Sequence, residues 1–471
     1  MAGKAITQKN IGKLIISSED SRELCFLLIY SVCELEAFSN LAAKAISRVP
    51  KKDTISPDFV RAMFYGTITY AYSIDFLIKH IAKSDVEKMD GVIRSIVRMS
   101  VWQFVFSSKV PEFAAVFQAV ELTRKYSPQA CAYVNAILRK ITNTPVDKFN
   151  LSQYKAEIEC SLKPEIYGVF KKSYGKDRAL SIGRALLEVN GFSIRYNTSK
   201  ISQDALIREL EQEGIFSSSG YFMNEALHIN ECEMEIDKSK SFEDGSIFVQ
   251  SEAAMLASRI ANPKSKDRIL DICSAPGGKT THIAQIVADD CQIDALDINE
   301  SRLELVKQNI ERLKLNSISC SIADATTLGT NPDFEAKLSS YDIVLADVPC
   351  SGLGLLARKP DIRRTITYDR IVELLEKLRV ILDNASKFVK PGGSLIYCTC
   401  TLNVDENENQ VKAFLDRNPY FYTESIEQYL PERLIINSDR EVCIKNGYIT
   451  LFPDVDNSDG FFICRMIKRL E

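Results

Sequence analysis

The sequence predicts a multidomain protein in which an all-α domain is followed by a small α/β unit and then by a larger α/β domain. Apolar residues recur at three- and four-residue spacing from Ser21 to about Ile141, and no stretch there alternates as a strand would. From Arg268 onward, strand-like and helix-like segments alternate, which is typical of a parallel sheet covered by helices on both faces. We place the three units at residues 1–145, 146–244 and 245–471.

The composition restricts the class of protein. With 471 residues, 45% of them hydrophobic and 26% charged, the chain can form several domains and is too apolar to be mostly disordered. The apolar run at residues 24–33 is too short to cross a bilayer, and the start of the chain lacks a signal-peptide core. We therefore expect a cytoplasmic protein that makes no contact with a membrane.

Cysteine and histidine usage points to thiol chemistry. The 13 cysteines show no paired spacing, which fits reduced thiols better than a disulfide framework. Only 3 histidines are present, so we expect no metal site. A cysteine with a special role should therefore act chemically.

Positive charge is concentrated at the front of the chain. The net charge is −4, yet residues 1–145 hold 19 Lys and Arg against 13 Asp and Glu, a net of +6 that leaves −10 for the rest. A basic module on an acidic body can steer a polyanion such as RNA, although solvated helix faces of this charge are equally common. Six basic side chains are candidate phosphate contacts: Arg94, Arg98, Arg124, Lys125, Arg139 and Lys140.

The middle unit is expected to follow a linker at residues 142–148. Helical sequence then continues to about Leu187, residues 192–197 alternate as a strand, residues 202–214 form an amphipathic pattern, and short strands are expected within 215–229. The unit is interpreted as a small RNA-binding subdomain, with an ordinary packing module as the alternative.

The C-terminal domain is expected to open with a helix at residues 248–260. Further helices are predicted at 300–315 and 366–389, and strands at 269–273, 293–297, 318–323, 341–347 and 394–399. In a sheet of this kind, ligands bind at the carboxyl ends of the strands.

The segment 269–281, I-L-D-I-C-S-A-P-G-G-K-T-T, predicts a strand, a glycine turn and a helix that together cradle a nucleotide. Gly277 and Gly278 let a ligand approach the backbone, and the N–H groups of the next helix favour a polar ligand edge. Asp297 ends the next strand, where it can bind ribose hydroxyls, and Asp324 ends the third, where it can bind an adenine amino group. The turn lacks G-x-G-x-x-G spacing, which weakens the dehydrogenase alternative, and S-adenosylmethionine suits it equally well. A plain strand-to-helix turn is the remaining alternative.

Two cysteines are predicted at neighbouring strand ends. D-V-P-C-S-G at residues 347–352 presents Cys350, and Y-C-T-C-T at residues 397–401 presents Cys400. A cysteine beside polar groups can be held as a thiolate, which attacks electrophilic carbon. Carbon 6 of cytosine is such an electrophile, and addition there makes carbon 5 nucleophilic enough to take a methyl group from a sulfonium. Elimination then frees the product.

These motifs, with R-K-P-D-I-R at residues 358–363 and G-F-F at 460–462, resemble the Sun/RsmB family of RNA cytosine-5 methyltransferases over about residues 245–471. The segments R-S-I-V-R-M-S-V-W-Q-F, A-V-F-Q-A-V-E-L-T-R-K-Y and Y-V-N-A-I-L-R-K resemble NusB-type RNA-binding domains. The resemblance implies a NusB-like N-terminal domain, a Rossmann-like class I methyltransferase domain and S-adenosyl-L-methionine as cofactor.

The resemblance also implies residue roles. Cys400 would be the nucleophile and Cys350 would assist release of the methylated RNA, while Asp347 would lie by the cytosine edge and Lys279 would join the catalytic group. Arg302 would meet the methionine carboxylate of the cofactor. The implied cofactor contacts are Cys273, Ser274, Ala275, Pro276, Gly277, Gly278, Lys279, Asp297, Arg302, Asp324 and Asp347.

Two residues depart from the family pattern. Val348 stands where Ala is usual and could narrow the pocket slightly, and Thr401 stands where Ser is usual but keeps the hydroxyl. Cys398 shares a strand face with Cys400 and is expected to be buried packing. Three basic side chains by the cleft are further candidate RNA contacts, or plain surface charge: Lys359, Arg363 and Arg364.

The predicted function is therefore S-adenosylmethionine-dependent formation of 5-methylcytosine in RNA, with 16S small-subunit rRNA as the expected substrate. Alternatives are a transfer RNA or other RNA target, or an assembly factor that binds RNA and cofactor without turnover. A DNA enzyme is disfavoured, because such enzymes attack with the cysteine of the Pro-Cys motif and need no second thiol. We expect a monomer.

Overall fold

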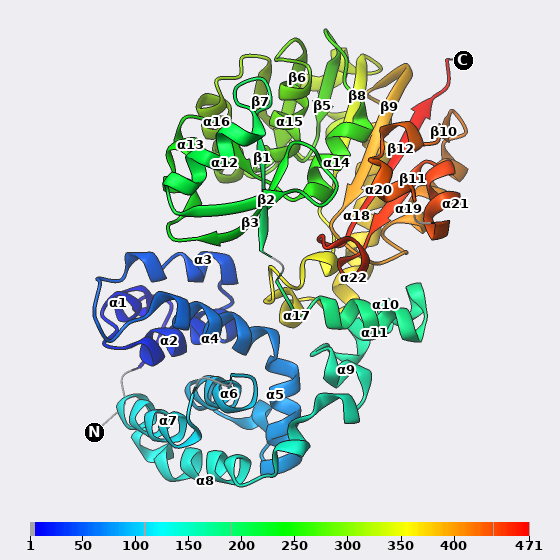
Figure 1. Cartoon of the computed structure of the whole chain (residues 1–471). Helices are drawn as coiled ribbons and strands as arrows, with labels where there is room; N and C mark the ends of the chain where they lie inside the picture. Colours follow the sequence, from blue (N-terminus) through cyan, green and yellow to red (C-terminus); the bar gives the residue numbers. More distant parts are fainter. Residues whose placement is uncertain (1–4, 108–109, 190, 437, 471) are drawn as a thin grey trace. The chain divides into compact units, whose positions relative to one another are not determined.

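The computed structural model describes residues 5–107, 110–189, 191–436 and 438–470, and it divides into two compact units. The first unit comprises residues 1–188 and 356–367, and the second comprises 189–355 and 368–471 (Figure 1). The boundary differs from the expected ones at 145 and 244, because the middle segment is shared: its helical part belongs to the first unit and its strands belong to the second.

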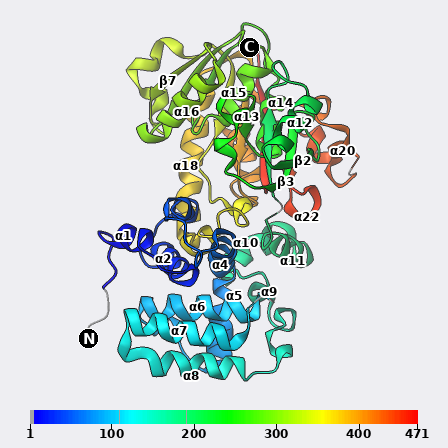
Figure 2. The same cartoon turned by 60° about the vertical axis from the view of Figure 1, so that its left-hand side comes forward.

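The first unit is built from helices, as the periodicity predicts. Helix α2 is its centre, because Leu24, Leu27 and Leu28 are fully buried and α2 packs against both α4 and α6. Asp20 caps α2 by accepting from the N–H groups of Arg22 and Glu23. Helices α6, α7 and α8 pack side by side (Figure 1 and Figure 2). The N-terminal helices are α1 (Ile11–Ile16), α2 (Ser21–Cys33), α3 (Ser39–Ala43), α4 (Pro57–Thr69), α5 (Ala71–Leu77), α6 (Gly91–Val105), α7 (Glu112–Tyr126) and α8 (Cys131–Thr142).

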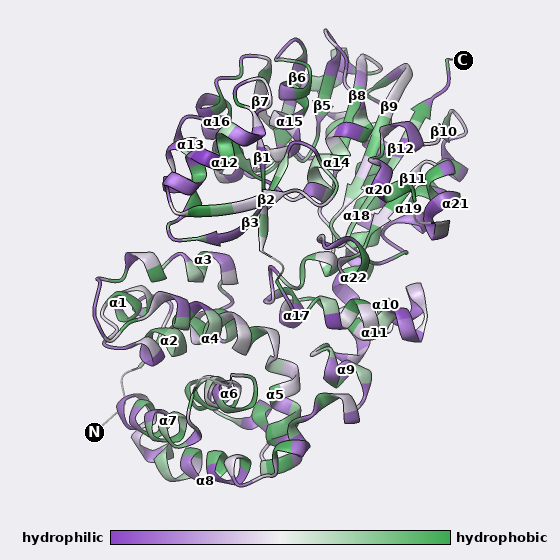
Figure 3. Ribbon diagram, viewed as in Figure 1, coloured by the Kyte–Doolittle hydropathy of each residue, from purple (hydrophilic) through white to green (hydrophobic). Residues whose placement is uncertain are grey.

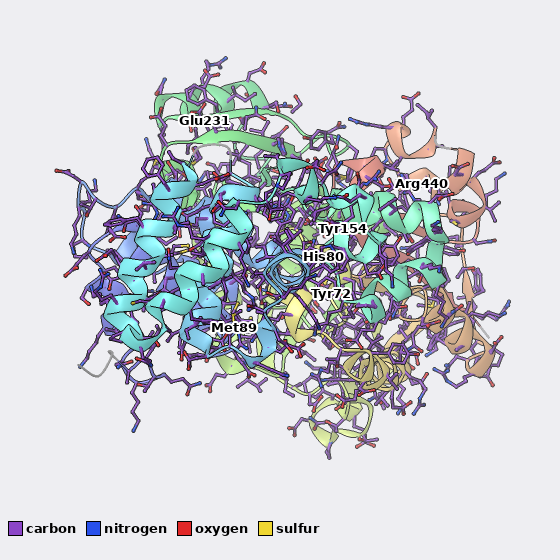
Figure 4. All side chains as sticks on the ribbon, turned by 90° about the horizontal axis from the view of Figure 1, so that it is seen from below. Tyr72, His80, Met89, Tyr154, Glu231 and Arg440 are labelled. Atoms are coloured by element: carbon purple, nitrogen blue, oxygen red, sulfur yellow. The ribbon has the colours of Figure 1, made fainter. Side chains whose placement is uncertain are left out.

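The segment after α8 stays with these helices. Tyr154 packs edge-on against His80, with ring centroids 5.6 Å apart, and both are labelled in Figure 4. The helices that follow are α9 (Ala156–Glu159), α10 (Pro164–Tyr174) and α11 (Lys176–Ala185), and the short α17 (Ile362–Thr365) joins them from far along the chain.

The second unit begins with a small antiparallel sheet in the order β2-β3-β1-β4. Its strands are β1 (Phe192–Tyr196), β2 (Ile215–Ser219), β3 (Ala226–Cys232) and β4 (Ile247–Val249), accompanied by α12 (Gln203–Gln212) and α13 (Lys240–Glu243). Phe248 pairs with Arg195 in this sheet, so the prediction that it starts a helix is wrong. The helix α14 (Glu252–Ala261) starts after Ser251, whose hydroxyl caps it by accepting from the N–H of Ala254.

A larger sheet carries the candidate site. Its order is β10-β12-β9-β8-β5-β6-β7, with β11 paired to β12. Strands β5, β6, β7, β8 and β9 run parallel, which confirms the prediction. Strands β10, β11 and β12 form an antiparallel edge that was not predicted. The strands are β5 (Arg268–Asp271), β6 (Gln292–Asp297), β7 (Ile318–Ile322), β8 (Tyr341–Asp347), β9 (Val389–Thr399), β10 (Phe421–Thr423), β11 (Tyr448–Leu451) and β12 (Phe461–Lys468).

Both faces of the large sheet are buried. Ile343 and Leu345 of β8 belong to one apolar cluster, while Val344 and Ala346 belong to the other, as alternation along a strand requires. The central strands are accordingly rich in hydrophobic residues (Figure 3). The remaining helices are α15 (Gly278–Ile286), α16 (Glu300–Leu313), α18 (Tyr368–Ser386), α19 (Glu408–Arg417), α20 (Glu432–Ile435), α21 (Glu441–Lys445) and α22 (Pro453–Asp456).

Within the part of the chain that the structure describes, no helix has both the length and the apolar character needed to cross a membrane.

Candidate active site

The glycine turn lies between β5 and α15, as predicted, and is tied to the neighbouring strand β6. The backbone N–H of Ser274 donates to the carbonyl of Leu296 at 2.8 Å, and the N–H of Gly277 donates back to the carbonyl of Ser274 at 2.7 Å. Gly277 has φ +96°, and a Cβ there would lie 3.1 Å from Cγ1 of Val306. The conformation and the close approach to α16 both favour glycine at this position.

A buried network holds the helix that follows this turn. Arg195 of β1 is fully buried and donates to the carbonyl of Gly278 at 2.8 Å and to Oγ1 of Thr281 at 3.1 Å. His282 follows Thr281 in α15, and its Nε2 lies 3.3 Å from Oε1 of Glu225. The small sheet therefore fixes the start of α15 through side chains that reach its first turns.

Carboxylates stand at the carboxyl ends of the parallel strands. Asp297, at the end of β6, accepts from the N–H of Ala275 at 3.3 Å, and Arg302 donates to the carbonyl of Ala275 at 2.7 Å. Asp324 follows β7 and accepts at one oxygen from the N–H and the hydroxyl of Thr326. Since β6 and β7 are neighbours, the two acids lie along one edge of the sheet. Carboxylates at the ends of parallel strands beside a glycine turn are typical of nucleoside-binding sites.

An ion pair joins the turn to β8. Lys279 Nζ lies 2.6 Å from Oδ2 of Asp347, and it also lies 5.0 Å from the centre of the Phe461 ring. Burial alone would lower the pKa of Lys279, but the Asp347 carboxylate outweighs it and the pKa is raised. Burial raises the pKa of Asp271, which accepts from the Thr280 hydroxyl behind this pair, to about 7. Lys279 is therefore a fixed positive charge at this edge.

The two predicted cysteines meet. Cys350 follows β8, Cys400 follows β9, and their Sγ atoms lie 3.2 Å apart. The strands are parallel neighbours in which Asp347 stands opposite Cys398, so the loops after them start side by side. The hydrogen bond with Cys400 and burial raise the pKa of Cys350 well above its ordinary value. Cys350 is therefore held as a thiol that can donate to the sulfur of Cys400.

The residues around the cysteines also support their loops. Cys398 is fully buried, which confirms its expected packing role, and its carbonyl accepts from the N–H of Val348 at 3.2 Å. In the G-F-F motif, Gly460 donates its N–H to the carbonyl of Gly354 at 3.0 Å, and Gly354 donates to the carbonyl of Cys400 at 3.0 Å. A Cβ on Gly354 would fall 2.0 Å from the Gly460 carbonyl oxygen, so the backbones can approach only as glycines.

Sequence reasoning missed a buried polar cluster beside the two cysteines. It contains Ser351, Thr401, Asn403, Glu406 and Asn407, all of which are buried. Two signals were present: a hydroxyl residue follows each cysteine, and a carboxylate lies only a few residues beyond Cys400. The run N-V-D-E-N-E at residues 403–408 reads as a polar loop, which hides the burial of Glu406.

The structure corrects part of the RNA-contact prediction. Arg98 is buried and donates to both carboxylate oxygens of Asp75, at 2.7 and 2.6 Å. Arg363 is buried and donates to the carbonyls of Cys160, Ser161 and Leu186 at 2.9, 3.2 and 2.6 Å. Both predictions are wrong, because these guanidinium groups bind acceptors inside the first unit.

The other predicted RNA contacts differ in exposure. Arg94 forms an ion pair with Glu34 in which only 19% of its side chain is exposed, so it too serves the helical packing. Arg124, Arg139 and Lys359 are exposed. Among the described residues, no group of three or more His, Cys, Asp or Glu side chains is placed to hold a metal ion.

Comparison with known proteins agrees with this geometry. Residues 258–467 match the family described as 16S rRNA methyltransferase RsmB/F, and residues 19–143 match the NusB family. The chain is 30% identical over 455 residues to a probable ribosomal RNA small subunit methyltransferase B of Synechocystis, covering 95% of this chain and 99% of that protein. It is 29% identical over 453 residues to the Bacillus subtilis protein of the same name, covering 95% and 98%.

A solved structure agrees as well. The crystal structure of PH0851 superposes with a TM-score of 0.78 at 25% identity, covering 99% of this chain and all of that one. The predicted NusB-like and Rossmann-like methyltransferase domains are thus confirmed. On the match to the Synechocystis protein over nearly the whole length of both chains, this chain belongs to the ribosomal RNA small subunit methyltransferase B family.

Proposed function

We propose that this protein transfers a methyl group from S-adenosylmethionine to carbon 5 of a cytosine in 16S small-subunit rRNA through a covalent bond to Cys400. The observation that carries the proposal is the pair of sulfur atoms 3.2 Å apart at the ends of β8 and β9. The names of its relatives, which act on the small ribosomal subunit RNA, support the choice of substrate.

The thiols of Cys400 and Cys350 have different roles in the proposed reaction. The Cys400 thiolate bonds to carbon 6 of the ring, which makes carbon 5 nucleophilic, and the methyl group joins carbon 5. Solvent then takes the proton from carbon 5, the electron pair of that bond restores the double bond between carbons 5 and 6, and the sulfur leaves carbon 6 as a thiolate. Cys350 stays a thiol in the free protein and is close enough to assist that elimination.

We assign the ion pair of Lys279 and Asp347 to the polar edge of the cytosine ring. Negative charge develops on the ring as the thiolate adds, and the Lys279 ammonium, which is fixed beside Asp347, stabilises such charge without reorganisation. Asp347 ends the strand that leads to Cys350 and is held by Lys279 at 2.6 Å. The Asp347 carboxylate accepts a hydrogen bond from the exocyclic amino group, and Lys279 fixes its orientation.

The methyl donor fits the edge described above. S-adenosylmethionine supplies an electrophilic methyl group on a positively charged sulfur. Asp297 and Asp324 accept hydrogen bonds from its ribose and adenine, and Arg302 attracts its carboxylate. The target cytosine must leave any stack to reach the cysteines.

A denaturing gel tests the roles of the thiols. Wild type, Cys350→Ala and Cys400→Ala are incubated with S-adenosylmethionine and hypomethylated small-subunit RNA. The proposal predicts an RNA–protein adduct that accumulates with Cys350→Ala and is absent with Cys400→Ala. An adduct that persists without Cys400 and disappears without Cys350 would reverse the roles. Methyl transfer to no RNA by any variant would favour a binding factor instead.

A further inference from the structure

We propose that Glu406 is a positioning residue that clasps the two cysteine loops and sets the distance between their sulfur atoms. The inference rests on the proposed function for its chemical meaning, but its structural part stands on contacts alone. Glu406 acts through Ser351 and Thr401, the residues that directly follow Cys350 and Cys400.

The loop of Cys350 is held at two points. The backbone N–H of Ser351 donates to Oε1 of Glu406 at 2.8 Å, and its hydroxyl donates to Oε2 at 2.6 Å. A backbone N–H and a side-chain hydroxyl of the same residue thus engage both oxygens of one carboxylate. This two-point contact fixes the direction in which the chain leaves Cys350.

The loop of Cys400 is held by the same carboxylate. Oγ1 of Thr401 lies 2.7 Å from Oγ of Ser351 and 3.5 Å from Oε2 of Glu406. Asn403 donates its amide to Oε2 at 2.9 Å. Since the Ser351 proton goes to Glu406, the Thr401 hydroxyl donates to Ser351, and Glu406 holds the Cys400 loop through Ser351 and Asn403.

The neighbouring residue holds Cys400 from the other side. Asn407 accepts from the hydroxyl of Thr399 at 2.5 Å and donates to the carbonyl of Thr401 at 3.0 Å. The residues before and after Cys400 are thus bound to one asparagine side chain. The pair Glu406 and Asn407 leaves the Cys400 backbone little freedom to move away from Cys350.

The clasp requires a carboxylate. Glu406 is fully buried, and its two oxygens accept from the backbone N–H and the hydroxyl of Ser351 and from the amide of Asn403, so both oxygens act as acceptors. In Glu406→Gln one oxygen becomes an amino group, which cannot accept, and at least one of these buried donors loses its partner. A change of one atom therefore breaks the clasp without creating a cavity.

The first test uses the rate of disulfide formation as a measure of how closely the two thiols are held, and it needs no RNA. Diamide, a thiol oxidant, takes the two S–H hydrogens and is reduced to the hydrazine as the disulfide between Cys350 and Cys400 forms. Its rate is followed by mass spectrometry of the peptides in full-length wild type, Glu406→Gln and Glu408→Gln. Glu408 is the matched control, because it lies two residues away and accepts from the hydroxyl of Thr450 instead.

We expect the disulfide to form at least about tenfold more slowly in Glu406→Gln than in the other two proteins. A rate equal to that of wild type, in a variant with the wild-type melting temperature, would overturn the proposal. If Glu406→Gln does not fold, Thr401→Val removes one hydroxyl of the cluster at constant shape, and Thr401→Ser restores that hydroxyl. Slower oxidation in the valine variant, rescued by serine, supports the clasp, and equal rates overturn it.

The second test asks whether the clasp serves turnover. The hydrogen bonds of Glu406 go to residues of the two cysteine loops, so Glu406→Gln should lower kcat at least about tenfold while leaving the KM for S-adenosylmethionine within about twofold. Cys350 would then be out of reach in the elimination step, and the RNA–protein adduct should accumulate as with Cys350→Ala. A rise in KM with unchanged kcat would contradict the role. If wild type transfers no methyl group, the proposed function fails, yet the oxidation rates still decide the clasp.

Discussion

At the residue scale, Cys350 and Cys400 differ in their surroundings more than in their chemistry. Both are partly exposed at strand ends and their sulfur atoms are in contact. The raised pKa of Cys350 keeps its proton in place, whereas the backbone of Cys400 is fixed by Asn407 and Gly354. The Cys350 sulfur is thus suited to keep its proton. The Cys400 sulfur is held in a fixed position, as the proposed attack on a cytosine ring requires.

The carboxylate of Asp347 is the residue-scale feature with the most direct consequence for rate. Asp347→Asn keeps the shape of the side chain but removes the charge that Lys279 binds. We expect kcat to fall about 100-fold, because the carboxylate that accepts from the exocyclic amino group is lost and a displaced base reacts far more slowly. Single-turnover methyl transfer to small-subunit RNA measures this.

The control for this change lies on the same strand. Asp342, near the opposite end of β8, forms an ion pair with Lys390 at the other edge of the sheet. Asp342→Asn should leave kcat unchanged within about twofold. Equal losses in both variants would mean that the charge at Asp347 acts on folding and has no part in the reaction.

At the element scale, the small sheet controls the helix of the glycine turn. Arg195, His282 and Glu225 are buried where β1 and β3 meet α15, and Arg259 of α14 donates to Glu225 at 2.7 Å. Burial, then the charge of Arg195, lowers the pKa of His282 to about 3. Burial alone would raise the pKa of Glu225, but hydrogen bonds from His282 and Arg259 outweigh it and lower the pKa to about 2.

These shifts predict that the second unit loses stability in mild acid. An unfolded histidine takes up a proton near pH 6.5, whereas folded His282 does so only near 3, so unfolding binds a proton between these values. The free energy of unfolding should therefore fall by about 1 kcal/mol between pH 7 and 5.5. The further loss from Glu225 begins below about pH 4.5, where an unfolded glutamate starts to protonate.

Urea unfolding at several pH values checks this prediction. Circular dichroism follows the whole chain, while the fluorescence of Trp102, the single tryptophan, reports the first unit separately. His282→Asn should flatten the pH dependence of the second unit above pH 5, and His80→Asn, at an exposed position in the first unit, should not. A wild-type slope in His282→Asn would contradict the assignment.

The elements show how far the sequence predicts the structure. Strand β8 has the predicted bounds, because the apolar run at residues 343–346 is flanked on both sides by polar sequence. Pairing of β10, β11 and β12 at the antiparallel edge depends on contacts between distant segments, which no local pattern reveals. Phe248 has a helical neighbourhood in sequence, yet its pairing with Arg195 makes it a strand residue.

The candidate site divides in the same way. The glycine turn, the aspartates and both cysteines could be predicted because their chemistry is written in short motifs at strand ends. Arg98 and Arg363 could not, because a sequence does not show whether an arginine finds an internal acceptor. Glu406 was missed for the converse reason: a charged residue in a polar loop gives no sign that it is buried.

At the scale of the whole molecule, the basic N-terminal domain is proposed to bind RNA through its exposed arginines. Charge reversal at Arg124 and Arg139 together should weaken RNA binding and reduce the slope of log affinity against log salt by about 2, one for each phosphate that is no longer neutralised. Filter binding at several salt concentrations measures both quantities. The reason is counterion release, which scales with the number of phosphates that the protein neutralises.

A matched control separates local binding from net charge. Arg370→Glu and Lys445→Glu make the same change in charge at exposed positions of the second unit, and each residue has an acidic neighbour on its own helix, as Arg124 has in Glu121. This pair should leave the slope unchanged. Equal effects of both pairs would reduce the N-terminal domain to a structural role.

The central claim, methylation at carbon 5 of cytosine through Cys400, is tested most directly by the hydrogen that this carbon loses. Small-subunit RNA carrying tritium at carbon 5 of its cytosines is incubated with unlabelled S-adenosylmethionine. Wild type should release one tritium for each methyl group transferred, and Cys400→Ala should release none. Methyl transfer without tritium release would place the new methyl group elsewhere and contradict the account.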